Sequence, residues 1–275
     1  MIHGSISDLI RLLEVQSAAP DTFSGRHLSA ERSRVYGGQF LGQGLMAALA
    51  DTGQTARSLQ CLYLRPGSAA TPLVYSVAKP ADGLREVQTH QNGKCLFTMV
   101  VRCGEPAGPP NVPMPAMPPP EQCVSREEGA KGLNSNTDST WAVLDSPFDY
   151  RFVENIWADD YRSPGHNVWF RAHNTTPAQR AQPQHVHQAV LAYFSDDTIM
   201  DNGLFPHGWQ HCWSNLQTAS LDHSLWFHQP VDIGEWLLFA QDSPVAAHGR
   251  GTTRGLFYTQ DGNLVASAYQ EILMR

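Results

Sequence analysis

The chain contains SLQCLYLRP at residues 58–66 and LDHSLWFHQP at residues 221–230, two segments that resemble each other. A second pair, QNGKCLF at residues 91–97 and QDGNLVA at residues 260–266, follows in the same order and at nearly the same spacing. Two blocks that recur in order over a distance much longer than a solenoid repeat indicate a duplicated unit. The sequence therefore predicts two related lobes.

Length and composition agree with two globular lobes in solution. The chain has 275 residues, enough for two domains of roughly 100 to 150 residues each. Its hydrophobic content is 41%, but no apolar run approaches the ~18 residues of a membrane span. Residues 1–19 lack the basic start and apolar centre of a signal peptide, so we expect a cytoplasmic protein with no membrane partner.

Charge and cysteine content narrow the class of partner. The net charge is −7 and no basic stripe is present, which argues against nucleic acid and implies that an anionic ligand would need local cations. The five cysteines form no CxxC pair, so neither a disulfide framework nor a zinc site is indicated. We expect no metal and no cofactor.

The first lobe, residues 1–104, is predicted to combine helices with an antiparallel sheet. A short helix over residues 6–15 carries a capping box from Ser5 and Asp8. A helix that opens at Gly38 is apolar on most faces and is therefore expected to be buried. Short turns containing Pro-Gly, Asp-Gly and Asn-Gly imply antiparallel pairing of the strands that they connect. These strands are predicted at residues 61–64, 72–78, 85–90 and 94–102.

A linker at residues 105–140 is predicted between the lobes. Its first part is too rich in proline for a helix or a central strand, so we expect it to be extended or disordered. The second lobe, residues 141–275, is predicted to begin with strands at residues 149–156 and 169–171. A helix over residues 185–197 is the expected counterpart of the Gly38 helix.

One buried helix wrapped by an antiparallel sheet, present twice, resembles the α+β double hotdog fold. Several short sequence motifs narrow the resemblance to the type II acyl-CoA thioesterases, the TesB-like family. The resemblance covers both lobes from about Val35 onward, apart from the linker. These motifs are YGGQ (36–39), LRPG (64–67), QNG (91–93), SD (195–196), LDHSLWFH (221–228) and AS leading to QE (266–271).

The resemblance implies hydrolysis of acyl-CoA to a carboxylic acid and CoA by a water molecule. Members of the family place this water with an Asp, a Ser or Thr, and a Gln from the second lobe, which correspond here to Asp196, Ser220 and Gln270. An ionised carboxylate can accept a proton from the water, while a hydroxyl and an amide can orient it. Relatives commonly have Thr in place of Ser220, and the hydroxyl is retained. Burial would raise the pKa of Asp196 and make it a better base.

The oxyanion and the substrate are assigned to the first lobe. Gly37, Gly38 and Gln39 open its central helix, where backbone N–H groups can bind developing negative charge and glycines allow close approach. The four histidines near the second-lobe helix and strand, His185, His187, His223 and His228, are interpreted as packing or satisfied polar residues, because no third metal ligand is apparent.

Each residue of the set also has a purely structural interpretation. Asp196 could be an ordinary carboxylate at a helix end, Ser220 could bond to neighbouring backbone, and Gln270 could be a ladder residue on a strand. Two departures from the family lie in the first lobe: the chain is shortened after Asp82-Gly83, and Gln60 stands where relatives tend to have His.

Two other functions remain open from the sequence. The departures leave open a non-catalytic acyl-CoA-binding or assembly protein. A hotdog hydratase needs an Asp with a His five residues later, whereas Asp196 is followed at that spacing by Asp201, so this class is disfavoured. Exposed sheet edges lead us to expect a homodimer or a higher homo-oligomer.

Overall fold

The computed structural model describes residues 4–27, 34–106, 108, 112–129, 131, 146–156, 165–204 and 216–275. Within these residues the helices are α1 (Ile6–Leu13), α2 (Gly37–Leu49), the 3-10 helix η1 (Pro120–Gln122), α3 (Arg126–Gly129), α5 (Pro177–Arg180), α6 (Gln184–Ser195) and α7 (Ile199–Asn202). The strands of the first half are β1 (Val15–Ala19), β2 (Thr22–Gly25), β3 (Ala56–Tyr63), β4 (Leu73–Ala81), β5 (Leu84–Gln91) and β6 (Lys94–Cys103). Those of the second half are β7 (Val124–Ser125), β8 (Phe148–Phe152), β9 (Val168–Ala172), β10 (Thr218–Ser220), β11 (Asp222–Phe227), β12 (Leu237–Ala247), β13 (Arg250–Thr259) and β14 (Leu264–Met274).

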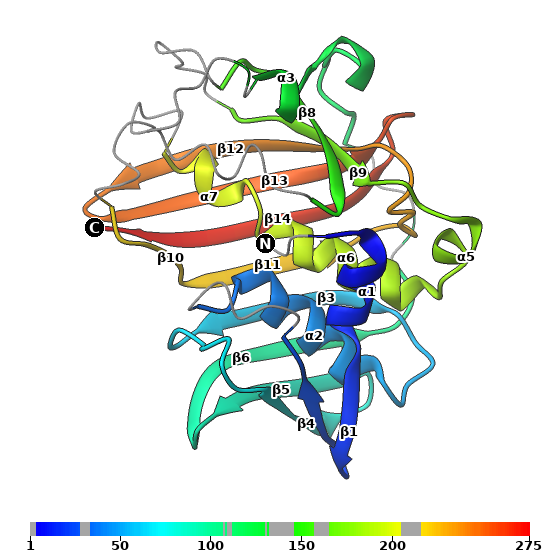
Figure 1. Cartoon of the computed structure of the whole chain (residues 1–275), viewed down its shortest axis with the longest axis vertical. Coiled ribbons are helices and arrows are strands. Elements are labelled where there is room, and N and C mark those ends of the chain that lie inside the picture. The colour runs from blue at the N-terminus through cyan, green and yellow to red at the C-terminus, as the bar shows by residue number, and fades with distance from the viewer. Residues whose placement is uncertain are drawn as a thin grey trace.

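All these strands belong to one antiparallel sheet. Its order is β1-β2-β4-β5-β6-β3-β11-β14-β13-β12-β9-β8-β7, with β10 paired to β14. The two halves meet where β3 pairs with β11, so the two similar segments of the sequence lie side by side (Figure 1). Leu62 is opposite Asp222 and Ser58 is opposite Trp226 in this register. The lobe boundaries at residues 104 and 140 stay a prediction.

The two long helices, α2 and α6, pack against each other on one face of the sheet (Figure 1). Both are buried along almost their whole length, as the sequence predicts for α2. A Cβ atom on Gly38 would lie 2.2 Å from the carbonyl oxygen of Tyr193, so this glycine permits the close crossing. The Tyr36 hydroxyl donates to the same carbonyl oxygen at 3.2 Å and ties the start of α2 to the end of α6.

Helix α1 closes the end of this helix pair. Its capping box is present, because the Ser5 side chain accepts from the backbone of Asp8 and the Asp8 side chain accepts from the backbone of Ser5. Its buried face is formed by Ile6, Leu9 and two further leucines, which contact α2 and α6. The predicted helix over residues 6–15 is confirmed but ends at Leu13, since the chain enters β1 at Val15.

The described part of the predicted linker is packed onto the second lobe, and its residues 112–119 belong to no helix or strand. Trp169 Nε1 donates to the carbonyl oxygen of Pro118 at 2.9 Å, and the Tyr258 hydroxyl donates to that of Pro113 at 3.4 Å. Met114 and Met117 cover apolar side chains on the sheet face that points away from α6. Proline prevents regular structure in residues 112–119, but η1, β7 and α3 follow. Residues 132–140 of the predicted linker lie outside the described residues.

No helix in the described part of the chain is long and apolar enough to cross a membrane.

Candidate active site

Asp196 stands directly after α6, at its C-cap position, and is only 5% exposed. The apolar helix carries it into the interior, and the left-handed backbone of Thr198, at φ 59°, turns the chain sharply after it. The neighbouring carboxylate, Asp197, accepts a hydrogen bond from the Tyr150 hydroxyl of β8 at 2.8 Å. Two consecutive carboxylates therefore point to different partners.

The structure brings together the three second-lobe residues predicted from the sequence. The Ser220 hydroxyl donates to Asp196 Oδ1 at 2.8 Å. Gln270 Nε2 donates to Ser220 Oγ at 3.0 Å. Ser220 reaches both partners because β10 pairs with β14, with Ser220 opposite Ile272, two residues from Gln270. The set is thus a connected chain of hydrogen bonds built from three separate elements.

Burial raises the pKa of Asp196 from its ordinary value of 3.8 to about 7. The nearby charge of Asp197 raises this pKa further, and the hydrogen bonds from Ser220 and Gln270 oppose the rise. A carboxylate with a pKa near 7 exists in both protonation states at neutral pH, which suits a group that must accept and later release a proton.

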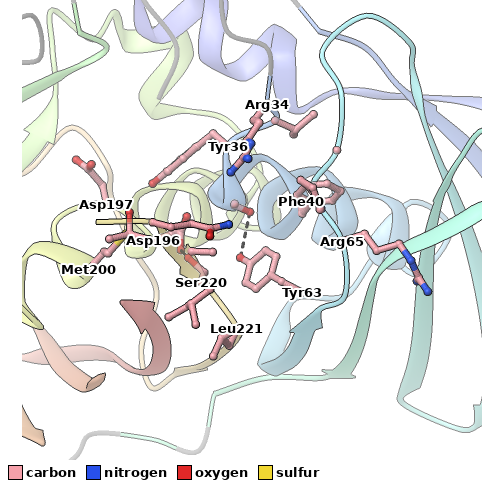
Figure 2. Close-up of a pocket in the computed structure, with 18 of the residues that line it drawn as sticks. Arg34, Tyr36, Phe40, Tyr63, Arg65, Asp196, Asp197, Met200, Ser220 and Leu221 are labelled. Atoms are coloured by element: carbon pink, nitrogen blue, oxygen red, sulfur yellow. Dashed lines mark hydrogen bonds between the residues drawn. The ribbon is translucent and has the colours of Figure 1, made fainter. Parts of the chain in front are cut away.

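Asp196 and Ser220 line a cavity of about 790 Å³ between the two halves. Figure 2 shows Tyr36, Phe40 and Tyr63 of the first half around the same space. The apolar part of the lining includes Phe40, Leu64, Met200, Leu221 and Leu273, and two arginines, Arg34 and Arg65, also belong to the wall. The cavity therefore combines an apolar surface, two cations and a buried carboxylate.

The three first-lobe residues predicted for substrate or oxyanion binding occupy different places. Gly37 lines the cavity, and a Cβ atom there would lie 2.5 Å from Asp196 Oδ2. Gly38 is pressed against α6 and is not part of the cavity lining. The Tyr63 hydroxyl donates to the carbonyl oxygen of Gly37 at 3.1 Å and holds the start of α2 in place.

Gln39, the third of these residues, is hydrogen-bonded inside the first lobe. Its amide donates to the carbonyl oxygen of Arg26 at 3.1 Å and lies 3.0 Å from His27 Nδ1. Its backbone N–H donates to Tyr36 at 3.1 Å. Since Gln39 has internal partners and does not line the cavity, it belongs to the polar interior of the first lobe. Successive residues of a helix point about 100° apart, so Gln39 faces a different direction from Gly38. The YGGQ motif alone does not reveal this difference.

Two further residues lie behind the site: His223, which the sequence analysis interpreted as a packing or satisfied polar residue, and Ser195, to which it assigned no role. His223 Nδ1 lies 2.5 Å from Gln270 Oε1, and His223 Nε2 lies 2.8 Å from Ser195 Oγ. Both side chains are fully buried. Strand alternation offered the signal, because Leu225 and Phe227 mark the inner face of β11 and His223 shares it.

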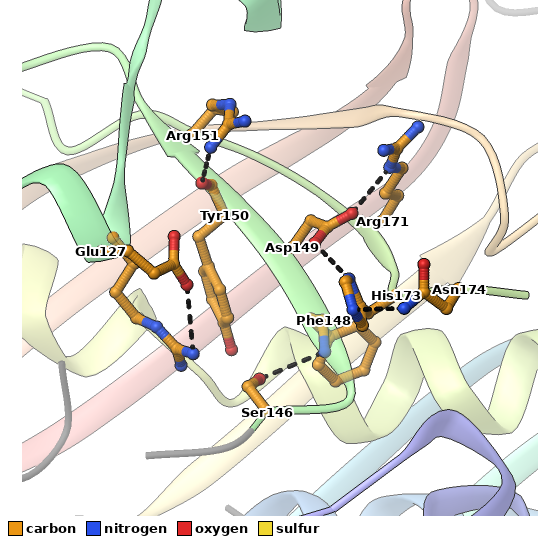
Figure 3. Close-up of polar contacts among 10 residues, drawn as sticks. Glu127, Ser146, Phe148, Asp149, Tyr150, Arg151, Arg171, His173 and Asn174 are labelled. Carbon is orange, nitrogen blue, oxygen red and sulfur yellow. Dashed lines mark hydrogen bonds and ion pairs between the residues drawn. The ribbon is translucent and has the colours of Figure 1, made fainter. Parts of the chain in front are cut away.

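The strand that supplies Tyr150 is itself held by polar contacts (Figure 3). Arg171 Nε donates to Asp149 Oδ2 at 2.9 Å, and the backbone N–H of Phe148 donates to Ser146 Oγ at 3.1 Å. These contacts fix the start of β8 and, through Tyr150, the position of Asp197 next to the site. Among the described residues, no group of three or more His, Cys, Asp or Glu side chains could hold a metal ion.

Comparisons with known proteins agree with this geometry. The profile of the family described as "Acyl-CoA thioesterase" matches residues 150–273, a span that contains Asp196, Ser220 and Gln270. The chain is 29% identical to "Acyl-CoA thioesterase 2" of Haemophilus influenzae, with 98% of each chain covered. The crystal structure of an acyl-CoA thioesterase II, TesB2, from Mycobacterium marinum superposes with a TM-score of 0.75 at 29% identity, covering 97% of each chain.

The chain is similar over nearly its whole length to TesB-like acyl-CoA thioesterases, and its second half matches the profile of the acyl-CoA thioesterase family. The fold predicted from the resemblance is also confirmed, because a solved protein of Alicyclobacillus acidocaldarius described as having a hot dog fold superposes with a TM-score of 0.74 over 96% of each chain, at 17% identity. As in other double hotdog proteins, the TesB-like sheet here is continuous across two lobes. The matched relatives are covered nearly end to end, so the resemblance extends to the whole two-lobed unit.

Proposed function

We propose that this protein hydrolyses an acyl-CoA thioester to a free carboxylic acid and CoA, using a water molecule held by Asp196, Ser220 and Gln270. The observation that supports this most is the hydrogen-bonded chain that starts at Asp196 and Ser220 on the cavity wall and continues to the buried Gln270 behind them. No covalent nucleophile is needed for this chemistry. The similarity to acyl-CoA thioesterases supplies the substrate class.

Ionised Asp196 accepts a proton from the water while the water oxygen bonds to the thioester carbonyl carbon. Collapse of the tetrahedral intermediate breaks the carbon–sulfur bond, and the proton held by Asp196 passes to the departing CoA thiolate. Ser220 and Gln270 restrict the water to an attack geometry, and most of their contribution to the rate comes from this restriction. The atoms balance, because one water is consumed and its two hydrogens end on the thiol and the carboxylic acid.

Negative charge on the carbonyl oxygen is assigned to the start of α2. The first N–H groups of a helix lack partners inside the helix, and the positive end of its dipole lies there. Tyr36 provides no side-chain cap and Gly37, the first residue of α2, lines the cavity, so its N–H is the donor assigned to the oxyanion. Arg34 and Arg65 supply the local cations that an anionic CoA ligand requires on a chain of net charge −7.

The test is release of free CoA thiol from short, medium and long acyl-CoAs by the wild-type protein, Asp196→Asn and Asp222→Asn. Asp222 is the matched control, because it lies on neighbouring β11 and accepts from the backbone of Glu271 without lining the cavity. We expect turnover by the wild type and by Asp222→Asn, and loss of at least 100-fold in Asp196→Asn. Acyl-CoA binding without turnover on any chain length would refute hydrolysis and support a non-catalytic binding protein instead.

Cytoplasmic location and homo-oligomeric assembly belong to the same proposal. Support for assembly comes from the sheet face opposite the helices, where Leu62, Trp226 and Tyr269 are 54%, 38% and 43% exposed on adjacent strands. Light scattering across a dilution series measures the assembly directly. A single mass equal to one chain at all concentrations would refute it.

A further inference from the structure

The hydrogen-bond chain of the site continues behind Gln270, away from the cavity. Gln270 Oε1 faces His223 Nδ1 at 2.5 Å, and His223 Nε2 faces Ser195 Oγ at 2.8 Å. Neither His223 nor Ser195 lines the cavity, and both are 0% exposed. They are therefore placed to act through Gln270 and not on substrate.

The direction of every bond in the chain follows from Asp196. An ionised carboxylate only accepts, so Ser220 must direct its single hydroxyl proton to Asp196 Oδ1. Ser220 Oγ can then only accept from Gln270, which requires the NH₂ group of that amide to face Ser220. The amide oxygen consequently faces His223, and His223 must carry its proton on Nδ1 to donate to it.

Ser195 completes the sequence of donors. Burial lowers the pKa of His223 to about 4, so the ring is neutral at pH 7 and has one N–H. With the proton on Nδ1, Nε2 is a bare acceptor and takes the hydroxyl proton of Ser195. The hydroxyl also lies 2.9 Å from the carbonyl oxygen of Ala192, but donating there would leave Nε2 without a donor in a buried site. While Asp196 is ionised, this is the arrangement that leaves every side-chain nitrogen and oxygen of the chain with a compatible partner.

We propose that Ser195 and His223 are positioning residues that lock the Gln270 amide with its NH₂ group toward Ser220 and the reacting water. The effect on turnover rests on the proposed function, whereas the tautomer of His223 does not. An amide without this lock can turn by 180° and present its oxygen to Ser220. The hydroxyl and the water then lose a donor, and the attack geometry is no longer unique.

A pair of variants tests the lock with little change in volume. His223→Leu removes both ring nitrogens, while His223→Asn keeps an N–H near the position of Nδ1. We expect kcat to fall about 10- to 100-fold in His223→Leu with KM within about threefold, and most of kcat to return in His223→Asn. A kcat of His223→Leu within threefold of wild type, or an equal loss in both variants, overturns the proposal.

A double-mutant cycle separates positioning from a general structural role. In a Gln270→Ala background, His223→Leu should cause no further loss of kcat, because the residue through which it acts is already gone. Equal losses in the presence and absence of Gln270 would show that His223 acts by another route. Thermal unfolding of each variant is followed in parallel.

Nitrogen-15 NMR of the histidine rings of the wild-type protein provides a readout independent of catalysis and of variant folding. At pH 9, where Asp196 is ionised, we expect His223, assigned by its disappearance in His223→Asn or by sequential correlations, to be the neutral tautomer with its proton on Nδ1. A proton on Nε2 overturns the inference whether or not acyl-CoA is hydrolysed. Absence of thiol release by a wild-type protein with the Nδ1–H tautomer would instead refute the proposed function and leave the hydrogen-bond order intact.

Discussion

Replacement of Asp196 by asparagine should abolish turnover and, at the same time, stabilise the folded protein above neutral pH. The pKa of this carboxyl is 3.8 in an ordinary environment and about 7 in the fold, with burial as the main cause. The folded state therefore binds the proton more tightly than the unfolded state does. Stability must fall as pH rises from about 4 to about 7, since an increasing share of the folded molecules has to bury the charge.

The size of the effect follows from the same two values. A shift of about 3 pKa units corresponds to about 4 kcal/mol of unfavourable free energy at pH 8 and about 2 kcal/mol at pH 5. Asparagine is neutral at both pH values and has nearly the same shape. The variant should thus exceed the wild type in free energy of unfolding by up to about 4 kcal/mol at pH 8, and by about half as much at pH 5.

Equilibrium urea unfolding at pH 5 and pH 8 measures this difference for the wild type, Asp196→Asn and the control Asp82→Asn. Asp82 is exposed on the β4–β5 turn, so its replacement should change stability little at either pH. Other ionisable groups near Asp196 are Asp197, Tyr36 and Tyr63, which are the same in all three proteins. The reasoning is refuted if Asp196→Asn differs from the wild type in free energy of unfolding by the same amount at both pH values, or is less stable than the wild type at pH 8. Either result would mean that the buried charge of Asp196 is not the dominant cost to stability.

Three further changes probe other parts of the site. Ser220→Ala should lower kcat about 10- to 100-fold, while Ser220→Thr retains the hydroxyl and should keep most of kcat, as measured by thiol release. Gly37→Ala places a Cβ 2.5 Å from Asp196 Oδ2, so we expect at least a tenfold lower kcat with a folded circular-dichroism spectrum. Gln188→Leu leaves the N–H and C=O of Ala56, both bonded to the Gln188 amide at 2.9 Å, buried without partners. It should cost about 2 to 4 kcal/mol in urea unfolding, with turnover per folded molecule unchanged.

Turn signals and apolar–polar alternation predicted β4 to β6, and helix-length runs of mostly apolar residues predicted both central helices, which are buried along almost their whole length. They did not predict the β1–β2 hairpin, because most of Val15–Ala19 is exposed and carries no apolar alternation. They also missed β13, which contains Gly251 and Gly255. A Cβ on Gly255 would lie 2.2 Å from the ring of Phe239, so packing against a neighbouring aromatic selects glycine where strand propensity disfavours it.

The proposed catalytic set was predictable from short motifs of the family, but the side chains that contact it from behind were not. A strand pattern shows that His223 faces the core, yet it does not show which of the buried polar groups it meets. That contact depends on the register between β11 and β14 and on the end of α6, which are set by pairing over long sequence distances. The same limit applies to Gln39. The YGGQ motif placed this residue near the site, but its side chain points from the helix toward Arg26 and His27.

The register also explains why a duplicated fold contains one such hydrogen-bonded chain among the described residues. Ser224 of β11 is opposite Tyr269, and Gln60 of β3 is opposite Val100, so Gln270 in the second lobe corresponds to Val101 in the first.

The same correspondence relates Ser220, which is opposite Ile272, to Ala56, which is opposite Cys103. At the end of α2, Leu49 and Ala50 stand where α6 leads into Asp196. Ala56 and Val101 are fully buried apolar residues, and Ala50, which is the C-cap of α2 as Asp196 is the C-cap of α6, is exposed. The first lobe therefore has neither the hydroxyl, the amide nor the buried carboxylate of the second. It instead contributes Gly37, at the start of α2, to the cavity wall beside Asp196, so that in the proposed mechanism each half of the duplication supplies a different part of the reaction.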